Sequence, residues 1–367
     1  MTLKAVDDVA TGDIAIDRRG AVARIALKRV RALNALTTAM RAEIAGALPA
    51  MARDASLYAV VLRSESGRAF SAGGDVRELV LWNASDPARA RAAFADEYRL
   101  NWALDCFSKP TVSLIDGMVM GSGVGLSIFN THRVAGEGYQ FAMPETAIGL
   151  FPDVGAAFHL ARLGGEIGTY LGLTGRGIGR ADAFHLGLAT HCIGAERFDE
   201  IEAALADAQP VDDVLDGLHK EPGPGALEPH KRAIAECFSA PTVEDIMARL
   251  AAWPGSDRDF AQGVADDLAR RSPTSLKITL RHLRQAAGLD LKGVLETDYR
   301  LAWRALEGHD FAEGVRAALI DKDNHPVWQP AKLEDVGDAM VEAYFAPLGP
   351  GEDLMLVNRD AMQILRY

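Results

Sequence analysis

Three glycines and two acids near the middle of the chain have the residue types and spacing that acyl-group chemistry needs. Gly121, Gly123 and Gly125 form a cluster, and Glu145 and Asp153 come later, each directly after a proline. Glycine has no Cβ, so it lets backbone approach a ligand closely. The first N–H groups of a helix lack internal partners and can point at a carbonyl oxygen that becomes negative. Facing such donors, a reactive acid could act on an acyl group.

Glu145 and Asp153 can meet only if the chain turns back between them. They lie eight residues apart, which is about 12 Å along a helix and about 26 Å along a strand. Gly149, Pro152 and Gly155 interrupt any regular element in this stretch. We therefore expect a bend that brings both acids to one site. Each feature alone has a plainer interpretation, as an exposed acid, a helix cap after proline or a simple turn.

Motifs of several other enzyme classes do not fit the sequence. The glycine cluster is not GxGxxG, because Leu126 occupies the last glycine position, and no GxxxxGK[ST] segment occurs. Neither Ser71 nor Ser122 stands in a GxSxG sequence. The histidines show no HExxH or other ligand spacing. We expect neither a serine nucleophile of that type nor a metal site.

Two units of strand, glycine-rich turn and helix are expected to position these residues. The first unit covers 59–82 and the second covers 111–129, which suggests a stacked ββα arrangement. Asp75 is placed to cap the helix of the first unit. Hydrophobic periodicity also predicts a hairpin and two helices, over 14–27, 38–52 and 86–107.

Beyond residue 155 the pattern becomes mostly helical. Residues 308–330 are expected to end in an extended segment, and EPGPG at 221–225 is the clearest linker. We divide the chain into a core of residues 1–210 that carries the site and a mainly helical region of residues 211–367. The helices expected after residue 155 cover 155–163, 165–173, 180–186, 197–208, 229–238, 242–252, 257–270, 274–287 and 291–305.

The composition indicates a folded protein that handles small molecules. The 367 residues carry a net charge of −12, with 49% hydrophobic and 25% charged residues. No dense basic segment occurs, so we expect no nucleic-acid partner. Three widely spaced cysteines and an N-terminus without a signal-type apolar segment favour the cytoplasm. The most apolar run, around 112–129, is interrupted by Asp116 and glycines, so we expect no membrane span.

Three segments together resemble the enoyl-CoA hydratase/isomerase, or crotonase, superfamily. They are AFSAGGDV at 69–76, KPTVSLIDGMVMGSGVGLS at 109–127 and FAMPETAIGLFPDVG at 141–155. The third segment is the most specific, and with DEYRLN at 96–101 it is similar to the 3-hydroxyisobutyryl-CoA hydrolase family within that superfamily. The resemblance implies an α/β fold, a crotonase-like ββα spiral core with a helical C-terminal region. It also implies an acyl-CoA substrate and no separate cofactor. A homo-oligomer is one expectation, since relatives often form trimers, and the alternative is that the longer C-terminal region replaces such contacts.

The resemblance also implies roles for individual residues. Glu145 matches the family's catalytic acid and Asp153 its partner acid, while Glu97 matches an acid near the acyl group. The main-chain N–H groups of Gly74 and Ser122 would hold the thioester oxygen, although glycine is usual at the position of Ser122. Substrate binding is further expected at Ala72 and Gly73.

One position bears on the choice of reaction. Hydratases of this superfamily use two glutamates, and the first would stand at Gly125, which has no side chain. The expected activity is therefore hydrolysis of a short 3-hydroxyacyl-CoA, a step of valine degradation if the acyl group is 3-hydroxyisobutyryl. An enoyl-CoA hydratase/isomerase and, more remotely, a non-catalytic CoA- or RNA-binding relative remain alternatives. Glu145 as nucleophile and Glu145 as general base are both open.

Overall fold

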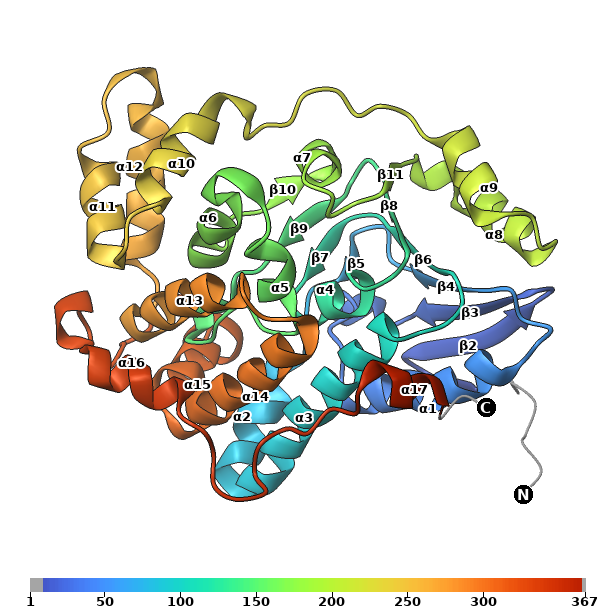
Figure 1. The fold of residues 1–367 in the computed structure, drawn as a ribbon, viewed down its shortest axis with the longest axis horizontal. Helices are drawn as coiled ribbons and strands as arrows, with labels where there is room; N and C mark the ends of the chain where they lie inside the picture. Colours follow the sequence, from blue (N-terminus) through green and yellow to red (C-terminus); the bar gives the residue numbers. More distant parts are fainter. Residues whose placement is uncertain (1–8, 365–367) are drawn as a thin grey trace.

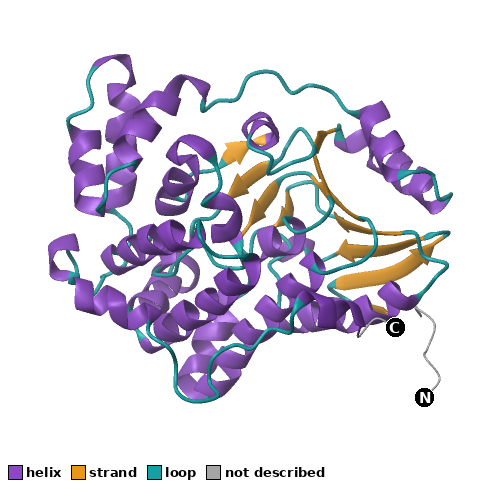
Figure 2. Cartoon of the chain, viewed as in Figure 1, coloured by secondary structure: helices purple, strands orange, loops and turns teal. Residues whose placement is uncertain are grey.

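The computed structural model describes residues 9–364, which form two β-sheets surrounded by helices (Figures 1 and 2). The larger sheet has seven strands in the order β1-β2-β3-β4-β6-β8-β11. Its strands are β1 (Val9–Thr11), β2 (Ile14–Arg19), β3 (Val22–Leu27), β4 (Ala59–Ser64), β6 (Thr111–Ile115), β8 (His132–Ala135) and β11 (His191–Cys192). The smaller sheet has the order β10-β9-β7-β5. Its strands are β5 (Ala69–Ser71), β7 (Met118–Met120), β9 (Gln140–Ala142) and β10 (Ile178–Gly179).

The chain alternates between the two sheets, and this alternation confirms the predicted ββα repeat. β4 lies in the larger sheet, β5 in the smaller one, and α2 (Val76–Ser85) follows. β6, β7 and α4 (Ser122–Ser127) repeat the pattern, and β8 and β9 begin it a third time. The strands of successive units pair in parallel within each sheet. Each unit therefore delivers the turn after its second strand to the same end of the smaller sheet.

Helices enclose both faces of the larger sheet because its strands are apolar on both sides. Val60 and Leu62 of β4 pack in a core with α1 (Thr38–Arg53) and α3 (Pro87–Asp105). Ala59 and Val61 point the other way, as neighbours on a strand must. They pack against α8 (Phe198–Ala206) and α9 (Val211–Leu218). The sheet is thus a buried, rigid support for the turns that follow its strands.

The remaining helices lie mostly in the C-terminal part of the chain, where α14 packs against α3 and α13 packs against α5 and α6 (Figure 1). Trp102 of α3 donates a 2.8 Å hydrogen bond from Nε1 to the carbonyl of Val357, so the end of the chain returns to the core. These helices are α5 (Ala156–Leu160), α6 (Ile167–Thr174), α7 (Arg180–His185), α10 (Lys231–Phe238), α11 (Val243–Ala251), α12 (Arg258–Ala269), α13 (Pro273–Ala286), α14 (Leu291–Glu307), α15 (Asp310–Val315), α16 (Asp338–Phe345) and α17 (Arg359–Ile364).

Most of the predicted elements occur within a few residues of their expected bounds, with three differences. The side chain of Asp75 does not cap α2, because it forms ion pairs with Arg29 at 3.0 Å and Arg77 at 3.1 Å. Several elements were not predicted, namely helices α9, α16 and α17 and strands β1, β8, β9, β10 and β11. The 308–330 segment contains α15 and a π-helical turn at Arg316–Ile320 before it becomes extended. The division at residue 210 stays a prediction, since one hydrophobic core includes residues from both parts.

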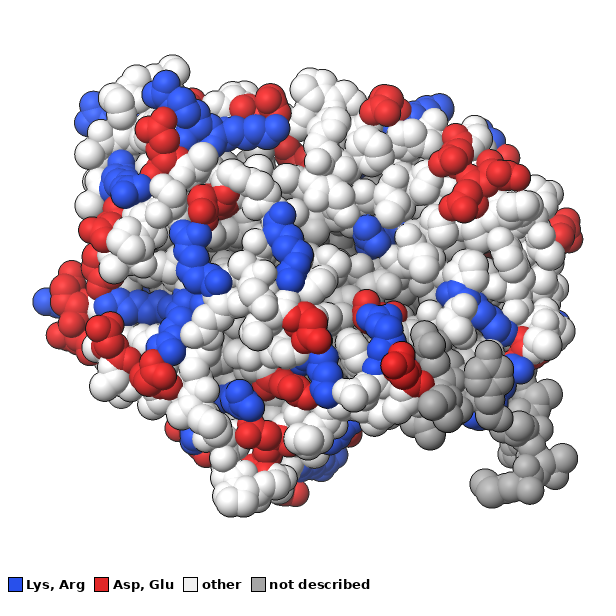
Figure 3. All heavy atoms as spheres, in the orientation of Figure 1, with Lys and Arg blue, Asp and Glu red and all other residues white. Residues whose placement is uncertain are grey.

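Charges of both signs are interspersed on the face shown in Figure 3, without one large field of a single sign. Among residues 9–364, no helix combines the length and apolar character required to cross a membrane.

Candidate active site

A cavity of about 300 Å³ lies where the turns of the ββα units meet. It is lined by all seven residues that the sequence singled out, which are Ala72, Gly73, Gly74, Glu97, Ser122, Glu145 and Asp153. These residues come from three turns and one helix, so only the tertiary structure brings them together. Their chemical roles stay predictions.

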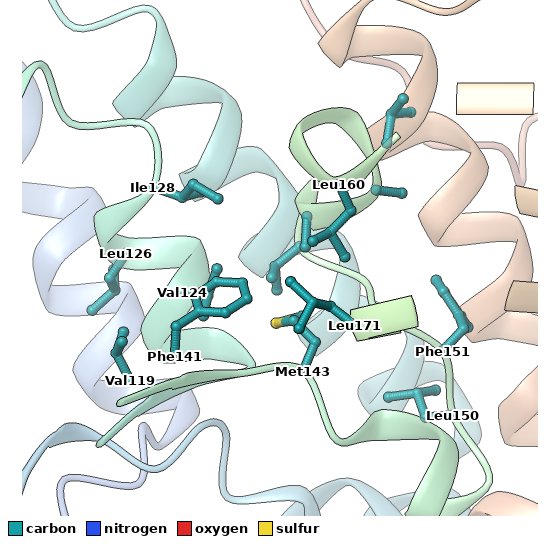
Figure 4. Close-up of a cluster of buried hydrophobic side chains, with 14 of the residues drawn as sticks. Val119, Val124, Leu126, Ile128, Phe141, Met143, Leu150, Phe151, Leu160 and Leu171 are labelled. Carbon is teal, nitrogen blue, oxygen red and sulfur yellow. The ribbon is translucent and has the colours of Figure 1, made fainter. Parts of the chain in front are cut away.

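The bend between the two acids forms as expected. After β9 the chain enters a short 3₁₀ helix at Glu145–Ile148, which ends at Gly149 in the left-handed region, with φ of 72°. The amide of Leu150 then donates back to the carbonyl of Glu145 at 3.0 Å. This reversal returns Asp153 to the cavity that Glu145 lines. A cluster of buried apolar side chains packs around the segment, with Val124, Met143 and Leu171 at the centre of the cluster (Figure 4).

Glu145 is buried, and one of its two carboxyl oxygens makes no hydrogen bond within the described residues. Its Oε2 atom has no hydrogen-bond partner among the described residues. A Cβ placed on Gly121 would come within 2.9 Å of Oε1, and Gly121 has φ of 46°, so glycine is needed there for two reasons. Burial raises the pKa of the Glu145 carboxyl from 4.5 to about 8, and the charge of Glu97 acts in the same direction. Such a carboxyl is suited to take up a proton near neutral pH.

Asp153 is held by a tyrosine that the sequence analysis did not select. The hydroxyl of Tyr98 donates to Asp153 Oδ2 at 2.8 Å, and both side chains are buried. Burial, followed by the charges of Glu97 and Glu145, raises the pKa of Asp153 well above its ordinary value. The hydrogen bond from Tyr98 opposes this shift but is the weaker influence. Asp153 therefore favours its protonated form.

Glu97 forms a buried ion pair with Arg41, a second residue that the sequence analysis missed. Arg41 NH1 lies 3.1 Å from Glu97 Oε2, and both residues line the cavity. Arg41 is 5% exposed. Arg41 thus balances the charge of Glu97, whereas Glu145 and Asp153 have no cationic partner among the described residues. No sequence signal could have found Arg41, because an arginine on an amphipathic helix is usually solvent-exposed.

The two proposed oxyanion donors lie next to each other. A Cβ built on Gly74 would be 2.7 Å from Ser122 Oγ. Ser122 is the first residue of α4, so its N–H has no intrahelical acceptor. Gly73 has φ of 107° and Gly121 has φ of 46°, so glycine precedes each donor where the backbone turns sharply. The hydroxymethyl group of Ser122 points toward Gly74.

The chain matches the family model described as enoyl-CoA hydratase/isomerase over residues 22–345. The chain belongs to this family. A rat protein named 3-hydroxyisobutyryl-CoA hydrolase, mitochondrial, is 42% identical over 349 residues, which cover 92% of this chain and 90% of that protein. The two comparisons together establish membership over nearly the whole length.

Two solved structures share the crotonase fold of this enoyl-CoA hydratase/isomerase family member. One is a carnitinyl-CoA dehydratase from Mycobacterium thermoresistibile, with TM-score 0.88 and 38% identity, covering 94% of this chain and 99% of that one. The other is an enoyl-CoA hydratase from Rhodobacter sphaeroides 2.4.1, with TM-score 0.87 and 39% identity, covering 94% and 100%. The expected α/β fold, a ββα spiral with a helical C-terminal region, is confirmed.

The expected cytoplasmic location is not supported, because the rat relative is named a mitochondrial protein. Within residues 9–364, no group of three or more His, Cys, Asp or Glu side chains is arranged to hold a metal ion.

The position of the first hydratase glutamate is closed in this member of the family. A Cβ built on Gly125 would lie 2.7 Å from Asn101 Nδ2 and 2.9 Å from Val154 Cβ. Asn101 occupies the space and donates from Nδ2 to the carbonyl of Gly125 at 3.0 Å. Sequence reasoning noted the missing side chain, and the structure adds that no larger one fits. The acids that line the cavity are instead Glu97, Glu145 and Asp153.

Proposed function

We propose that this protein hydrolyses the thioester of a short 3-hydroxyacyl-CoA, with 3-hydroxyisobutyryl-CoA giving 3-hydroxyisobutyrate and CoA as the first candidate. The observation that carries the proposal is the pair of buried acids, Glu145 and Asp153, in one cavity with the amides of Gly74 and Ser122, while position 125 has no room for a hydratase glutamate. The name of the rat relative supports the choice of substrate. The reaction uses no cofactor beyond the CoA that the substrate carries.

The proposed mechanism assigns one task to each group. The thioester oxygen lies between the N–H groups of Gly74 and Ser122, which stabilise the negative charge of the tetrahedral intermediate. Glu145 either attacks the carbonyl carbon to give a mixed anhydride or deprotonates the water that attacks. Asp153 gives its proton to the departing sulfur. In the anhydride route water then cleaves the anhydride and gives a proton back to Asp153, which releases the product acid and restores the Glu145 carboxylate. A thiol with a pKa of about 8.5 leaves more readily than an alkoxide, so modest acid assistance is enough.

The pH dependence of kcat/KM tests these assignments. Glu145 acts as a carboxylate in either route, and burial raises its pKa to about 8. We therefore expect kcat/KM to rise about tenfold per pH unit below pH 8. Loss of the Asp153 proton should lower the rate and form an alkaline limb of the profile, because burial and the neighbouring acids raise the pKa of Asp153 well above its ordinary value. A rate that is already at its plateau at pH 6 would contradict the assignment of Glu145.

The competing function is enoyl-CoA hydration, favoured by the names of the two solved structures. Two assays on one enzyme preparation separate the functions. Thiol release, followed with Ellman's reagent, should occur with 3-hydroxyisobutyryl-CoA or 3-hydroxypropionyl-CoA. Crotonyl-CoA should show no loss of enoyl absorbance. Loss of that absorbance without thiol release would establish a hydratase, and failure to bind CoA in any form would revive the alternative of a non-catalytic RNA-binding relative.

A further inference from the structure

A buried histidine–aspartate pair lies behind the turn that carries Asp153. His282 of α13 approaches Asp298 of α14, with Nε2 to Oδ1 at 2.6 Å. The two residues are 1% and 0% exposed, and neither lines the cavity of the candidate site. Placing two polar side chains in the core is costly unless their hydrogen bonds are made. Apolar residues at these two positions would stabilise the core at least as well. Stability alone therefore does not explain why a histidine and an aspartate are buried here.

The pair contacts the turn on both sides of Asp153. On one side, Asp298 Oδ2 accepts a hydrogen bond from the amide of Gly155 at 2.8 Å. On the other side, the His282 ring meets the Phe151 ring edge-on, with centroids 5.7 Å apart and an angle of 90°. Phe151 lies on the side of its apolar cluster that is nearest the C-terminal helices (Figure 4). In the sequence, Asp153 lies midway between the two contacted residues, Phe151 and Gly155.

The turn has a backbone conformation that needs such support. Val154, directly after Asp153, has φ of 52°. A β-branched residue rarely adopts the left-handed region, because its side chain collides with the backbone there. Conformations of this kind persist only where the surroundings hold them. Gly155 also has positive φ, and Leu291 and Leu295 of α14 fill the space that a Cβ would need.

The charge of the pair also bears on Asp153. His282 Nδ1 has no hydrogen-bond partner among the described residues, so the ring joins the pair through Nε2, to which we assign the proton that Asp298 accepts. Asp298 then accepts from two donors as an anion, although burial raises its pKa. The charges of Glu97, Glu145 and Asp298 all raise the pKa of Asp153. Arg41, which is paired with Glu97, is the cation that faces this group of acids from α1.

We propose that His282 and Asp298 are positioning residues for Asp153, holding its turn in the strained conformation that points the carboxyl into the cavity. The inference rests on the proposed function, in which Asp153 delivers a proton to the leaving sulfur. It also gives the C-terminal helices α13 and α14 a part in the active site. Neither residue touches the reacting atoms.

Asp298→Ala removes the acceptor for Gly155, and Asp298→Asn keeps an acceptor but removes the charge. We expect Asp298→Ala to lower kcat by about 10- to 100-fold, as loss of an orienting partner typically does, with KM changed less than threefold. Asp298→Asn should restore most of kcat and move the alkaline limb of the pH profile to lower pH, since Asp153 loses a negative neighbour. Asp182→Ala is the matched control, because Asp182 is also buried and accepts from two backbone amides, at Ala226 and Leu227.

Amide hydrogen exchange gives a second measurement that does not depend on turnover. Peptides covering 150–158 should exchange faster in Asp298→Ala than in the wild type or in Asp182→Ala. An equal loss of kcat in the Asp298→Ala and Asp182→Ala variants, or an unchanged pH profile in Asp298→Asn, would overturn the proposal. If the Asp298→Ala variant does not fold, the pH profile of the Asp298→Asn variant tests the proposal by itself. Absence of thiol release by the wild type would reject the proposed function instead, while the exchange result would still report on the turn.

Discussion

Glu145→Gln should lower kcat for thioester cleavage by about 10³-fold, in the range expected for loss of a general base, or by more if Glu145 is the nucleophile. Glutamine keeps the shape of the side chain but cannot accept the proton or form the anhydride. Substrate binding should survive, because the amides of Gly74 and Ser122 are main-chain groups. Thiol release under single-turnover conditions measures the effect. A variant that keeps turnover within tenfold of the wild type would exclude both proposed routes.

The same substitution should stabilise the fold at alkaline pH. The folded protein holds the Glu145 proton up to about pH 8, whereas the unfolded chain releases it near 4.5. Unfolding therefore releases a proton between these values, so the wild-type free energy of unfolding falls as pH rises from 4.5 to 8. Glutamine stays neutral, and its advantage should grow from nothing at pH 4.5 to several kcal/mol above pH 8.

Denaturant unfolding at pH 5 and pH 8.5 measures this change, with Glu334→Gln as a control for loss of an exposed carboxylate. Equal stability of the Glu145→Gln variant and the wild type at both pH values would contradict the burial argument.

Gly125→Glu should fail to create a hydratase and should destabilise the protein by about 3–5 kcal/mol or more. The first side-chain carbon would already lie 2.7 Å from Asn101 Nδ2 and 2.9 Å from Val154 Cβ. The rest of the glutamate would displace Asn101 or push on the turn that carries Asp153, and its charge would be buried next to a cavity that three acids already line. Thiol release should fall together with stability, and no loss of crotonyl-CoA absorbance should appear.

Gly46→Ala is the matched control for this variant. Gly46 is an exposed position inside helix α1, and nothing lies within 4 Å of a Cβ built there. Alanine should raise stability by about 0.5–1 kcal/mol, because it restricts the unfolded chain and favours the helix. A Gly125→Glu variant that folds with wild-type stability and gains hydratase activity would contradict this prediction. It would show that the side chain at position 125 selects between hydrolysis and hydration.

Local patterns were enough to predict most of the secondary structure. The hairpin of β2 and β3, the helices α1 and α3, and both ββα units follow from periodicities of two and 3.6 residues and from glycine turns. One error occurred where a distant partner changes the outcome. Asp75 was expected to cap α2, but Arg29, 46 residues away in sequence, takes its carboxylate instead. A capping rule considers only neighbours along the chain, so it could not anticipate this ion pair.

The linear sequence was sufficient to select the candidate groups: the acids at 145 and 153, the glycine turns, the expected main-chain donors and the absence of a side chain at position 125. The environment of these groups became visible only in the folded chain. The hydrogen bond from Tyr98 to Asp153 and the ion pair of Arg41 with Glu97 join residues 55 and 56 positions apart. The raised pKa of Glu145 comes from burial first of all. Burial and charge proximity are properties of packed neighbours in space, and a linear order of residues does not contain them.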